Sequence, residues 1–174
     1  MSAKRTLILT ALIGLFLLTA FAEDPVRDQN QPLAPMWLNQ SPTVAWWAPE
    51  IYSWAKEYDL NPNVIATLMQ IESCGLPEAE STSSAQGLFQ VMPFNFPEAY
   101  QGRMQDPEIN AEIGIQYYNY VFEKSGDNLL MAFAAYNGGP SKLNQPIGLW
   151  PEETQRYYYW AQMAIDALQG AEQS

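Results

Sequence analysis

The stretch IESCGLPEAESTSSAQGLFQVMP, residues 71–93, places one glutamate at the end of an apolar run and follows it with a loop of small polar residues. The apolar residues before Glu72 recur at helical spacing, so Glu72 lies at the carboxyl end of a predicted helix. Burial and the partial negative charge of a helix C-terminus both raise the pKa of a carboxyl group. A carboxylic acid that stays protonated near neutral pH can act as a general acid. The alternative is a surface glutamate that merely ends a helix.

The loop after Glu72 favours the catalytic interpretation. Gly75 and Gly87 allow sharp turns or the close approach of a ligand. The apolar residues around Gln90 must be buried nearby, which argues against a merely solvated loop. Hydroxyl groups that can donate and accept hydrogen bonds come from Ser73, Ser81, Thr82, Ser83 and Ser84. Together these features predict a site for a neutral, hydroxyl-rich ligand beside an acid.

Helical patterns account for most of the remaining chain. Asn61-Pro62 and Asp106-Pro107 are typical helix starts, with an N-cap followed by proline at the first helical position. Asp127 is a candidate cap for a further short helix. Apolar residues recur every three or four positions in the predicted helices 49–58, 62–72, 107–121, 129–136 and 151–168. No long stretch alternates with period two, so we predict a mainly α domain with at most a small β-hairpin between Ser81 and Gln90.

The N-terminal part of the chain divides into two predicted segments. Residues 1–22 combine Lys4 and Arg5 with an apolar run and end in Ala20-Phe21-Ala22, the layout of a cleaved signal peptide. An uncleaved membrane anchor is the alternative. Residues 23–45 are rich in proline and predict a flexible linker, with an arm packed on the domain as the alternative. The catalytic domain is then expected at residues 46–170.

The charge and the composition exclude several classes of protein. Cleavage after Ala22 would remove Lys4 and Arg5, two of the eight basic residues, and change the net charge from -11 to -13. Such a chain is not expected to bind nucleic acid, which requires lysine and arginine on the phosphates. The chain has no histidine, which excludes histidine-dependent nucleophilic catalysis and almost every zinc site. Cys74 is the only cysteine, so no intramolecular disulfide forms. We expect no metal and no cofactor.

Several blocks resemble the soluble lytic transglycosylase family. The first block is Glu72-Ser73, Pro77, Ala79, Ser81, Ala85, Gly87-Leu88 and Gln90-Val91-Met92-Pro93. Three further blocks follow in family order: Asn110 with Gly114 and Tyr117, the run Ala135-Tyr136-Asn137-Gly138-Gly139-Pro140, and Glu153-Thr154 with Tyr157. The resemblance covers about Trp47 to Ala167. One block alone is a weak signal, but four in order with sensible spacing are a strong one.

The resemblance implies a lysozyme-like helical fold and cleavage of peptidoglycan glycan strands without water. One glutamate, here Glu72, would protonate the leaving glycosidic oxygen and then, as an anion, accept a proton from the muramoyl 6-hydroxyl. Ser81 would hold the substrate N-acetyl group or orient the acid, and Tyr157 would hydrogen-bond near Glu72. The cleft would be lined by Gln90, Tyr136 and Asn137, although Tyr136 can equally be plain core.

Departures from the family pattern and rival functions remain open at this stage. Ser84 stands where the family usually has glycine, so it needs an unfavourable backbone conformation if that glycine has positive φ. Glu78 and Glu80 are expected to be solvated, and Glu153 to cap or support a helix. The rivals are a hydrolytic muramidase with a second acid and a non-catalytic wall-binding module. We expect an exported monomer in the periplasm or cell wall, with a cell-envelope assembly complex as a candidate partner.

Overall fold

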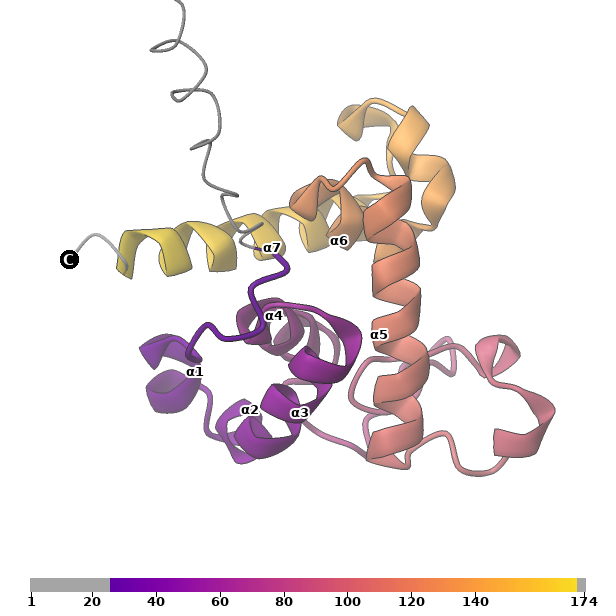
Figure 1. The fold of residues 1–174 in the computed structure, drawn as a ribbon. Helices are drawn as coiled ribbons and strands as arrows, with labels where there is room; N and C mark the ends of the chain where they lie inside the picture. Colours follow the sequence, from indigo (N-terminus) through magenta and orange to yellow (C-terminus); the bar gives the residue numbers. More distant parts are fainter. Residues whose placement is uncertain (1–25, 172–174) are drawn as a thin grey trace, which may run out of the picture.

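A computed structural model describes residues 26–171 of this chain, and its regular structure is helical (Figure 1). The predicted signal peptide at residues 1–22 lies outside the described residues. Within residues 26–171 no strand forms, and the predicted hairpin is reduced to two isolated bridges, Glu80 to Gln86 and Gln86 to Val91. The prediction of a mainly α domain is therefore confirmed.

The elements follow one another as α-helices and short 3-10 helices. In chain order they are α1 (Pro35–Gln40), α2 (Pro42–Trp46), α3 (Ala48–Tyr58), α4 (Pro62–Ser73), η1 (Pro93–Asn95), η2 (Glu98–Tyr100), α5 (Pro107–Lys124), α6 (Leu129–Gly138), η3 (Pro140–Asn144), η4 (Ile147–Leu149) and α7 (Glu152–Ala171). The five predicted helices correspond to α3, α4, α5, α6 and α7.

Helix α4 lies at the centre of the fold, between α3 on one side and α7 on the other (Figure 1). Its start matches the prediction, because the Asn61 side chain accepts a hydrogen bond of 2.8 Å from the Asn63 N–H and Pro62 occupies the first turn. Every residue from Pro62 to Met69 is buried. A helix that is buried on all sides is apolar over most of its surface, which explains why apolar residues fill most positions before Glu72.

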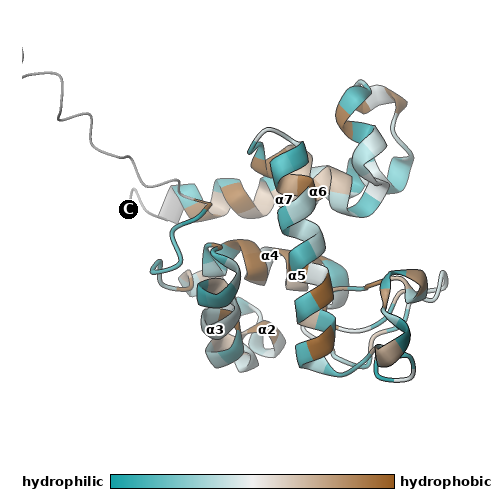
Figure 2. Cartoon of the chain, turned by 45° about the vertical axis from the view of Figure 1, so that its right-hand side comes forward, coloured by the Kyte–Doolittle hydropathy of each residue, from teal (hydrophilic) through white to brown (hydrophobic). Residues whose placement is uncertain are grey.

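Helix α5 stands upright in Figure 1 and has neighbours along both of its halves. In Figures 1 and 2, residues 75–105 lie beside its N-terminal half, and the segment that holds η3 and η4 lies beside its C-terminal half. Figure 2 also shows hydrophobic and hydrophilic bands alternating along α5. Its buried residues include Ile115 and Tyr118, which belong to the core. One face of α5 therefore packs inward and another remains available to solvent.

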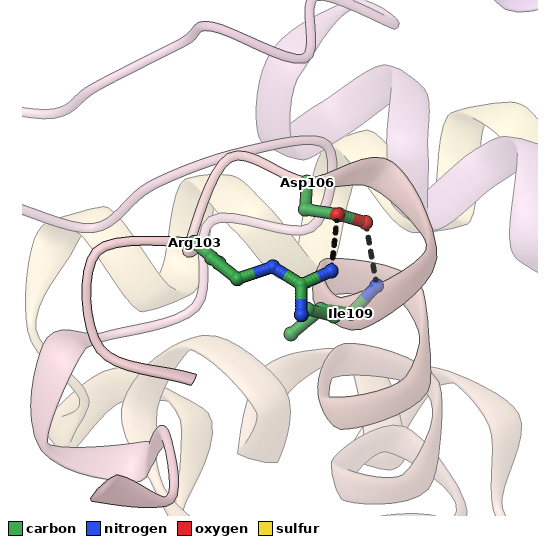
Figure 3. Close-up of polar contacts among 3 residues, drawn as sticks. All are labelled: Arg103, Asp106 and Ile109. Carbon is green, nitrogen blue, oxygen red and sulfur yellow. Dashed lines mark hydrogen bonds and ion pairs between the residues drawn. The ribbon is translucent and has the colours of Figure 1, made fainter. Parts of the chain in front are cut away.

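The start of α5 is fixed by Asp106, as predicted. One carboxylate oxygen of Asp106 accepts a hydrogen bond of 3.4 Å from the Ile109 N–H, and the other pairs with Arg103 at 2.9 Å (Figure 3). The hydrogen bond from Arg103 is the main reason that the pKa of Asp106 lies below its usual value. This cap ends the loop 74–106 and sets the position from which α5 rises.

Residues 26–45, predicted as a flexible linker with a packed arm as the alternative, pack on the domain in the structure. Val26, Leu33 and Trp37 are buried in the core. Pro35 and Pro42 each stand in the first turn of a short helix, α1 or α2, where proline is well tolerated. Pro35 and Pro42 therefore start helices, and the buried side chains of Val26, Leu33 and Trp37 pack this segment against the domain.

Two details at the C-terminal helices complete the fold. The cap of α6 is Asn128, whose side chain accepts a hydrogen bond of 3.0 Å from the Met131 N–H. The prediction of Asp127 as this cap is wrong, because Asp127 adopts a left-handed conformation with φ of 61° just before the helix. Glu152 and Glu153 lie in the first turn of α7, near its positive end. Neither α7 nor any other helix within residues 26–171 is long and apolar enough to cross a membrane.

Candidate active site

Glu72 lies in the last turn of α4, and its carboxyl group meets a tyrosine from α7. The Tyr157 hydroxyl donates a hydrogen bond of 2.6 Å to Oε1 of Glu72. Tyr157 itself is only 4% exposed, whereas Glu72 is half-buried and keeps part of its surface accessible. The pair is 85 residues apart in sequence, so only the packing of α7 on α4 brings the two groups together.

The surroundings of Glu72 favour its protonated form. Burial raises the pKa of Glu72 to about 8, and the charge of Glu153 contributes to the increase. The hydrogen bond from Tyr157 acts in the opposite direction, because it stabilises the anion and lowers the pKa of Glu72. Glu72 is therefore largely a neutral acid at pH 7, beside a donor that can stabilise its anion after the proton has left.

Two tyrosines near Glu72 remain protonated donors. Burial raises the pKa of Tyr157 and of Tyr136 well above the usual value, and the charge of Glu72 raises both further. The Tyr136 hydroxyl donates a hydrogen bond of 2.7 Å to the Phe89 carbonyl. Tyr136 therefore joins α6 to the loop after Glu72, so its hydroxyl is engaged within the protein.

The loop after Glu72 is tied to the end of α4 by Ser73. The buried Ser73 hydroxyl donates to the Leu88 carbonyl at 2.8 Å and accepts from the Gly75 N–H at 3.1 Å. Cys74 adopts the left-handed conformation that commonly ends a helix. Ser73 thus supports the helix end and holds the returning part of the loop next to Glu72.

Asn110 holds the same loop from α5. Its buried side chain donates to the carbonyls of Gln86 and Met104 at 2.7 and 2.8 Å and accepts from the Phe89 N–H at 2.8 Å. Gly87 lies directly against it, with φ of 80°, and a Cβ atom there would be 2.3 Å from Nδ2 of Asn110. The glycine is therefore required both for its backbone conformation and for close packing.

Ser81 and Gln90 are engaged within the loop itself. The Ser81 hydroxyl oxygen accepts hydrogen bonds from the N–H groups of Ser83 at 3.2 Å and Ala85 at 3.0 Å. The Gln90 side-chain Nε2 donates to the carbonyls of Ala79 at 3.1 Å and Gly87 at 3.0 Å. These bonds leave the hydroxyl proton of Ser81 and the Oε1 of Gln90 for other partners. Both residues shape the loop.

Ser84 occupies the strained position that the sequence led us to expect. Its φ is 66°, in the left-handed region that favours glycine. The Ser84 N–H donates a hydrogen bond of 2.9 Å to the Ser81 carbonyl. The turn therefore retains the shape that a glycine would adopt there, at the cost of backbone strain.

Asn137 and Thr154 connect the end of α6 to the start of α7. The Thr154 hydroxyl donates a hydrogen bond of 2.8 Å to Oδ1 of Asn137. Thr154 is buried, whereas Asn137 is half-buried. The amide nitrogen of Asn137 takes no part in this bond and can serve as a donor to a ligand.

The structure thus divides the predicted site residues into two groups. Tyr157 contacts Glu72 directly, and Tyr136 lies near enough to affect the electrostatics of the site. Hydrogen bonds within the loop or between helices engage Ser81, Gln90 and Asn137, and none of these bonds reaches Glu72. The sequence places Asn110 within a motif but does not by itself predict its role in holding the loop. The available signal is a polar residue among apolar ones within a predicted helix.

Among the acids of the described residues, Glu153 is the one whose charge acts on the pKa of Glu72. Glu78 and Glu80 are exposed, as predicted. Within the described part of the chain, no group of three or more histidine, cysteine, aspartate or glutamate side chains could hold a metal ion. Glu153 is exposed in the first turn of α7 and is the acid whose charge acts on Glu72.

Comparison with known proteins agrees with this arrangement. Residues 50–158 match the family described as the transglycosylase SLT domain. The chain belongs to the transglycosylase SLT domain family. The matched region of this SLT domain runs from α3 to the first turns of α7 and therefore contains both Glu72 and Tyr157.

The SLT domain is similar to several curated transglycosylases. It is 33% identical over 101 residues to the soluble lytic murein transglycosylase of Salmonella typhimurium, covering 52% of this chain and 16% of that protein. It is 30% identical over 117 residues to the transglycosylase of Enterobacteria phage PRD1, covering 67% of this chain and 42% of the phage protein. The chain thus spans only part of the relatives that it matches.

Solved structures show the same fold. The 70 kDa soluble lytic transglycosylase SLT70 of Escherichia coli has a TM-score of 0.61 and 20% identity, over 76% of this chain and 28% of that chain. Lytic transglycosylase Slt of Pseudomonas aeruginosa, solved as an inactive mutant, has a TM-score of 0.55 and 23% identity, over 76% of this chain and 25% of that chain. The lysozyme-like fold that the sequence predicted is confirmed.

Proposed function

We propose that this protein is an exported lytic transglycosylase that cleaves the glycan strands of peptidoglycan, with Glu72 as its single general acid and base. The names of its relatives support the reaction class. Because the chain spans 16% of the Salmonella relative, its own site must carry the argument. The observation that carries it is Glu72, a half-buried acid whose pKa is about 8 and whose carboxylate accepts a hydrogen bond from Tyr157.

In the first step, neutral Glu72 donates its proton to the oxygen between N-acetylmuramic acid and N-acetylglucosamine. The bond from the anomeric carbon to that oxygen breaks, and its electron pair stays with the leaving oxygen. The N-acetyl group of the substrate can assist at the anomeric carbon. Glu72 is now an anion, which the Tyr157 hydroxyl stabilises at 2.6 Å.

In the second step, anionic Glu72 accepts the proton of the muramoyl 6-hydroxyl. The oxygen of that hydroxyl attacks the anomeric carbon and closes a 1,6-anhydro ring. Glu72 is again protonated and ready for another cycle, and no water is consumed. A pKa of about 8 suits both steps near neutral pH, because the acid holds its proton in the resting site yet gives it up readily.

The other predicted site residues complete the proposal. The Ser81 hydroxyl proton, the Gln90 Oε1 and the Asn137 amide nitrogen are the groups left for a sugar once the internal hydrogen bonds are counted. Tyr136 would shape the site through its bond to the Phe89 carbonyl. Because peptidoglycan lies outside the cytoplasmic membrane, we place the protein in the periplasm or cell wall.

A hydrolytic muramidase is the rival that one observation favours. Most glycoside hydrolases use two carboxyl groups, and the charge of Glu153 acts on Glu72. Glu153 is exposed at the start of α7, so we assign it an electrostatic role.

Digestion of purified sacculi, followed by mass spectrometry of the products, tests the proposal. We expect 1,6-anhydromuramic ends from the wild type and no cleavage by a folded Glu72→Gln variant. Reducing-end muramic acid without the anhydro product would point to the muramidase instead. A wild type that binds sacculi without cleaving them would be a wall-binding module.

A further inference from the structure

A series of aromatic rings leads from the neighbourhood of Glu72 to the surface of α5. Tyr136, whose pKa responds to the charge of Glu72, has its ring 5.3 Å from that of Tyr117. The Tyr117 ring is stacked on Tyr120, with 6.2 Å between centroids and 27° between planes. Tyr120 is 46% exposed, so the series ends at the surface of the protein.

A lysine stands at the end of this series. The Lys124 ammonium lies 5.7 Å from the centroid of the Tyr120 ring, within the range of a cation–π contact. Residues 117, 120 and 124 are separated by three and four positions, which places them on one face of the helix. The contact with Tyr120 therefore holds the ammonium at the outer end of the aromatic series.

The charge of Lys124 is not neutralised by a carboxylate of the described residues. The ion pairs within residues 26–169 join Arg103 to Asp106 and Arg156 to Glu152. The whole chain carries a net charge of -11 and should repel an anionic polymer over most of its surface. A lysine without an ion pair, at the outer end of a series of rings that begins near Glu72, is therefore a position at which an anionic part of the substrate can bind.

The Lys124 ammonium and the Tyr120 hydroxyl together indicate what kind of ligand group could bind. The Lys124 ammonium and the Tyr120 phenol can both donate hydrogen bonds. An ionised carboxylate only accepts hydrogen bonds and carries the opposite charge. A sugar hydroxyl has no charge for a lysine to compensate. In intact peptidoglycan, the carboxylates lie on the stem peptides. These peptides are carried by muramic acid, and muramic acid alternates with a sugar that carries no peptide.

We propose that Tyr120 and Lys124 anchor a carboxylate of the stem peptide on a muramic acid next to the cleaved bond. This anchor rests on the proposed function and extends it, because it makes the enzyme favour strands that carry peptides. It acts on binding alone, since neither side chain contacts Glu72. Its loss should therefore raise KM and leave kcat unchanged.

The test compares two substrates, glycan strands with intact stem peptides and the same strands after an amidase has removed the peptides, which leaves only the lactyl carboxylate on each muramic acid. We expect Lys124→Ala to raise KM for the peptide-bearing strands about two- to fivefold, the range for an exposed ion pair, and to leave KM for the stripped strands unchanged. Tyr120→Phe, which removes only the hydroxyl, should cause a smaller increase. Lys56→Ala on α3 and Tyr159→Phe on α7 are matched exposed controls and should resemble the wild type.

The outcomes separate the anchor from the function on which it rests. Equal increases in KM on both substrates would mean that the two residues bind the glycan, including its lactyl carboxylate, or support the fold, and the anchor would be rejected. The anchor would also be rejected if Lys124→Ala left both KM values unchanged while the wild type cleaved both substrates. If the wild type cleaves neither substrate, the proposed function itself fails. Salt should weaken the preference for peptide-bearing strands, because screening reduces an exposed charge contact.

Discussion

The Tyr157 hydroxyl, 2.6 Å from Oε1 of Glu72, lowers the pKa of Glu72 while burial raises it, and the balance is a pKa of about 8. Burial supplies a neutral acid for the first step of the proposed reaction, and the hydrogen bond keeps the anion accessible for the second. The charge of Glu153 adds to the effect of burial. Burial and two side chains of α7 therefore set the protonation state of Glu72 together.

Two substitutions should shift the pH profile in opposite directions. Because the first step needs protonated Glu72, kcat/KM should fall as pH rises through about 8. Tyr157→Phe removes a bond that lowers the pKa of Glu72, so this descending limb should move to higher pH, at reduced activity. Glu153→Gln removes a charge that raises the pKa, so the limb should move to lower pH. Identical limbs in all three proteins would show that Glu72 does not govern the profile.

Glu72→Gln should change the pH dependence of stability. The native state keeps the Glu72 proton up to about pH 8, whereas the unfolded chain releases it near the usual value of 4.5. The native state therefore holds more protons between these values, and the stability of the wild type falls as pH rises through that window. The variant lacks this loss, which is on the order of a few kcal/mol.

Urea unfolding of both proteins from pH 4 to pH 9 measures this difference. The free energy of unfolding of Glu72→Gln, relative to the wild type, should rise from about pH 4.5 and level off above about pH 8. Parallel profiles would mean that the pKa of Glu72 is the same in the folded and unfolded states.

Gly87→Ala should destabilise the loop that surrounds Glu72. The new Cβ atom would lie 2.3 Å from Nδ2 of Asn110, at a backbone φ of 80°. We expect a loss of about 3 kcal/mol from backbone strain and overpacking together. Gly102→Ala is the matched control, because Gly102 has φ of 81° but no atom within 4 Å of the added Cβ. It should lose about 1 kcal/mol, and equal losses in thermal unfolding would refute the proposed collision.

Ser84→Gly should stabilise the protein. Ser84 holds φ of 66°, and relief of this conformation is worth about 1 kcal/mol before the greater flexibility of unfolded glycine is counted. Ser83 is also exposed but does not share the positive φ. Ser83→Gly should therefore lose about 0.5–1 kcal/mol. The two variants should move the melting temperature in opposite directions, and a shared direction would count against strain at Ser84.

Leu33→Ala tests whether the N-terminal segment is part of the domain. Leu33 is 3% exposed in the core, and its truncation should cost about 3 kcal/mol. Leu38, in the same segment, is 47% exposed, so Leu38→Ala should stay within about 0.5 kcal/mol of the wild type. Denaturant unfolding compares the two. Equal free energies of unfolding for the two variants would mean that the segment is a linker and not part of the domain.

Local patterns predicted the helices well because their causes are local. Asn61 and Asp106 cap α4 and α5 as their sequences indicate, since a cap bonds to N–H groups two or three positions away. The prediction of Asp127 as the cap of α6 was wrong, because the adjacent Asn128 offers the same chemistry and the left-handed turn at Asp127 leaves Asn128 as the cap. The prediction of a flexible N-terminal linker failed because the segment is rich in proline and only a few of its apolar residues pack into the core.

The sequence by itself determined a mainly helical domain, a glutamate at the end of an apolar helix, and an adjacent loop that requires glycine-like turns. These follow from periodicity, caps and backbone sterics, which depend on neighbours along the chain. Only the tertiary structure decided that Tyr157 donates to Glu72, that Asn110 holds the loop, and that Ser81 and Gln90 use part of their hydrogen bonding on it. Contacts between distant residues depend on how helices pack, and that packing is a property of the whole core.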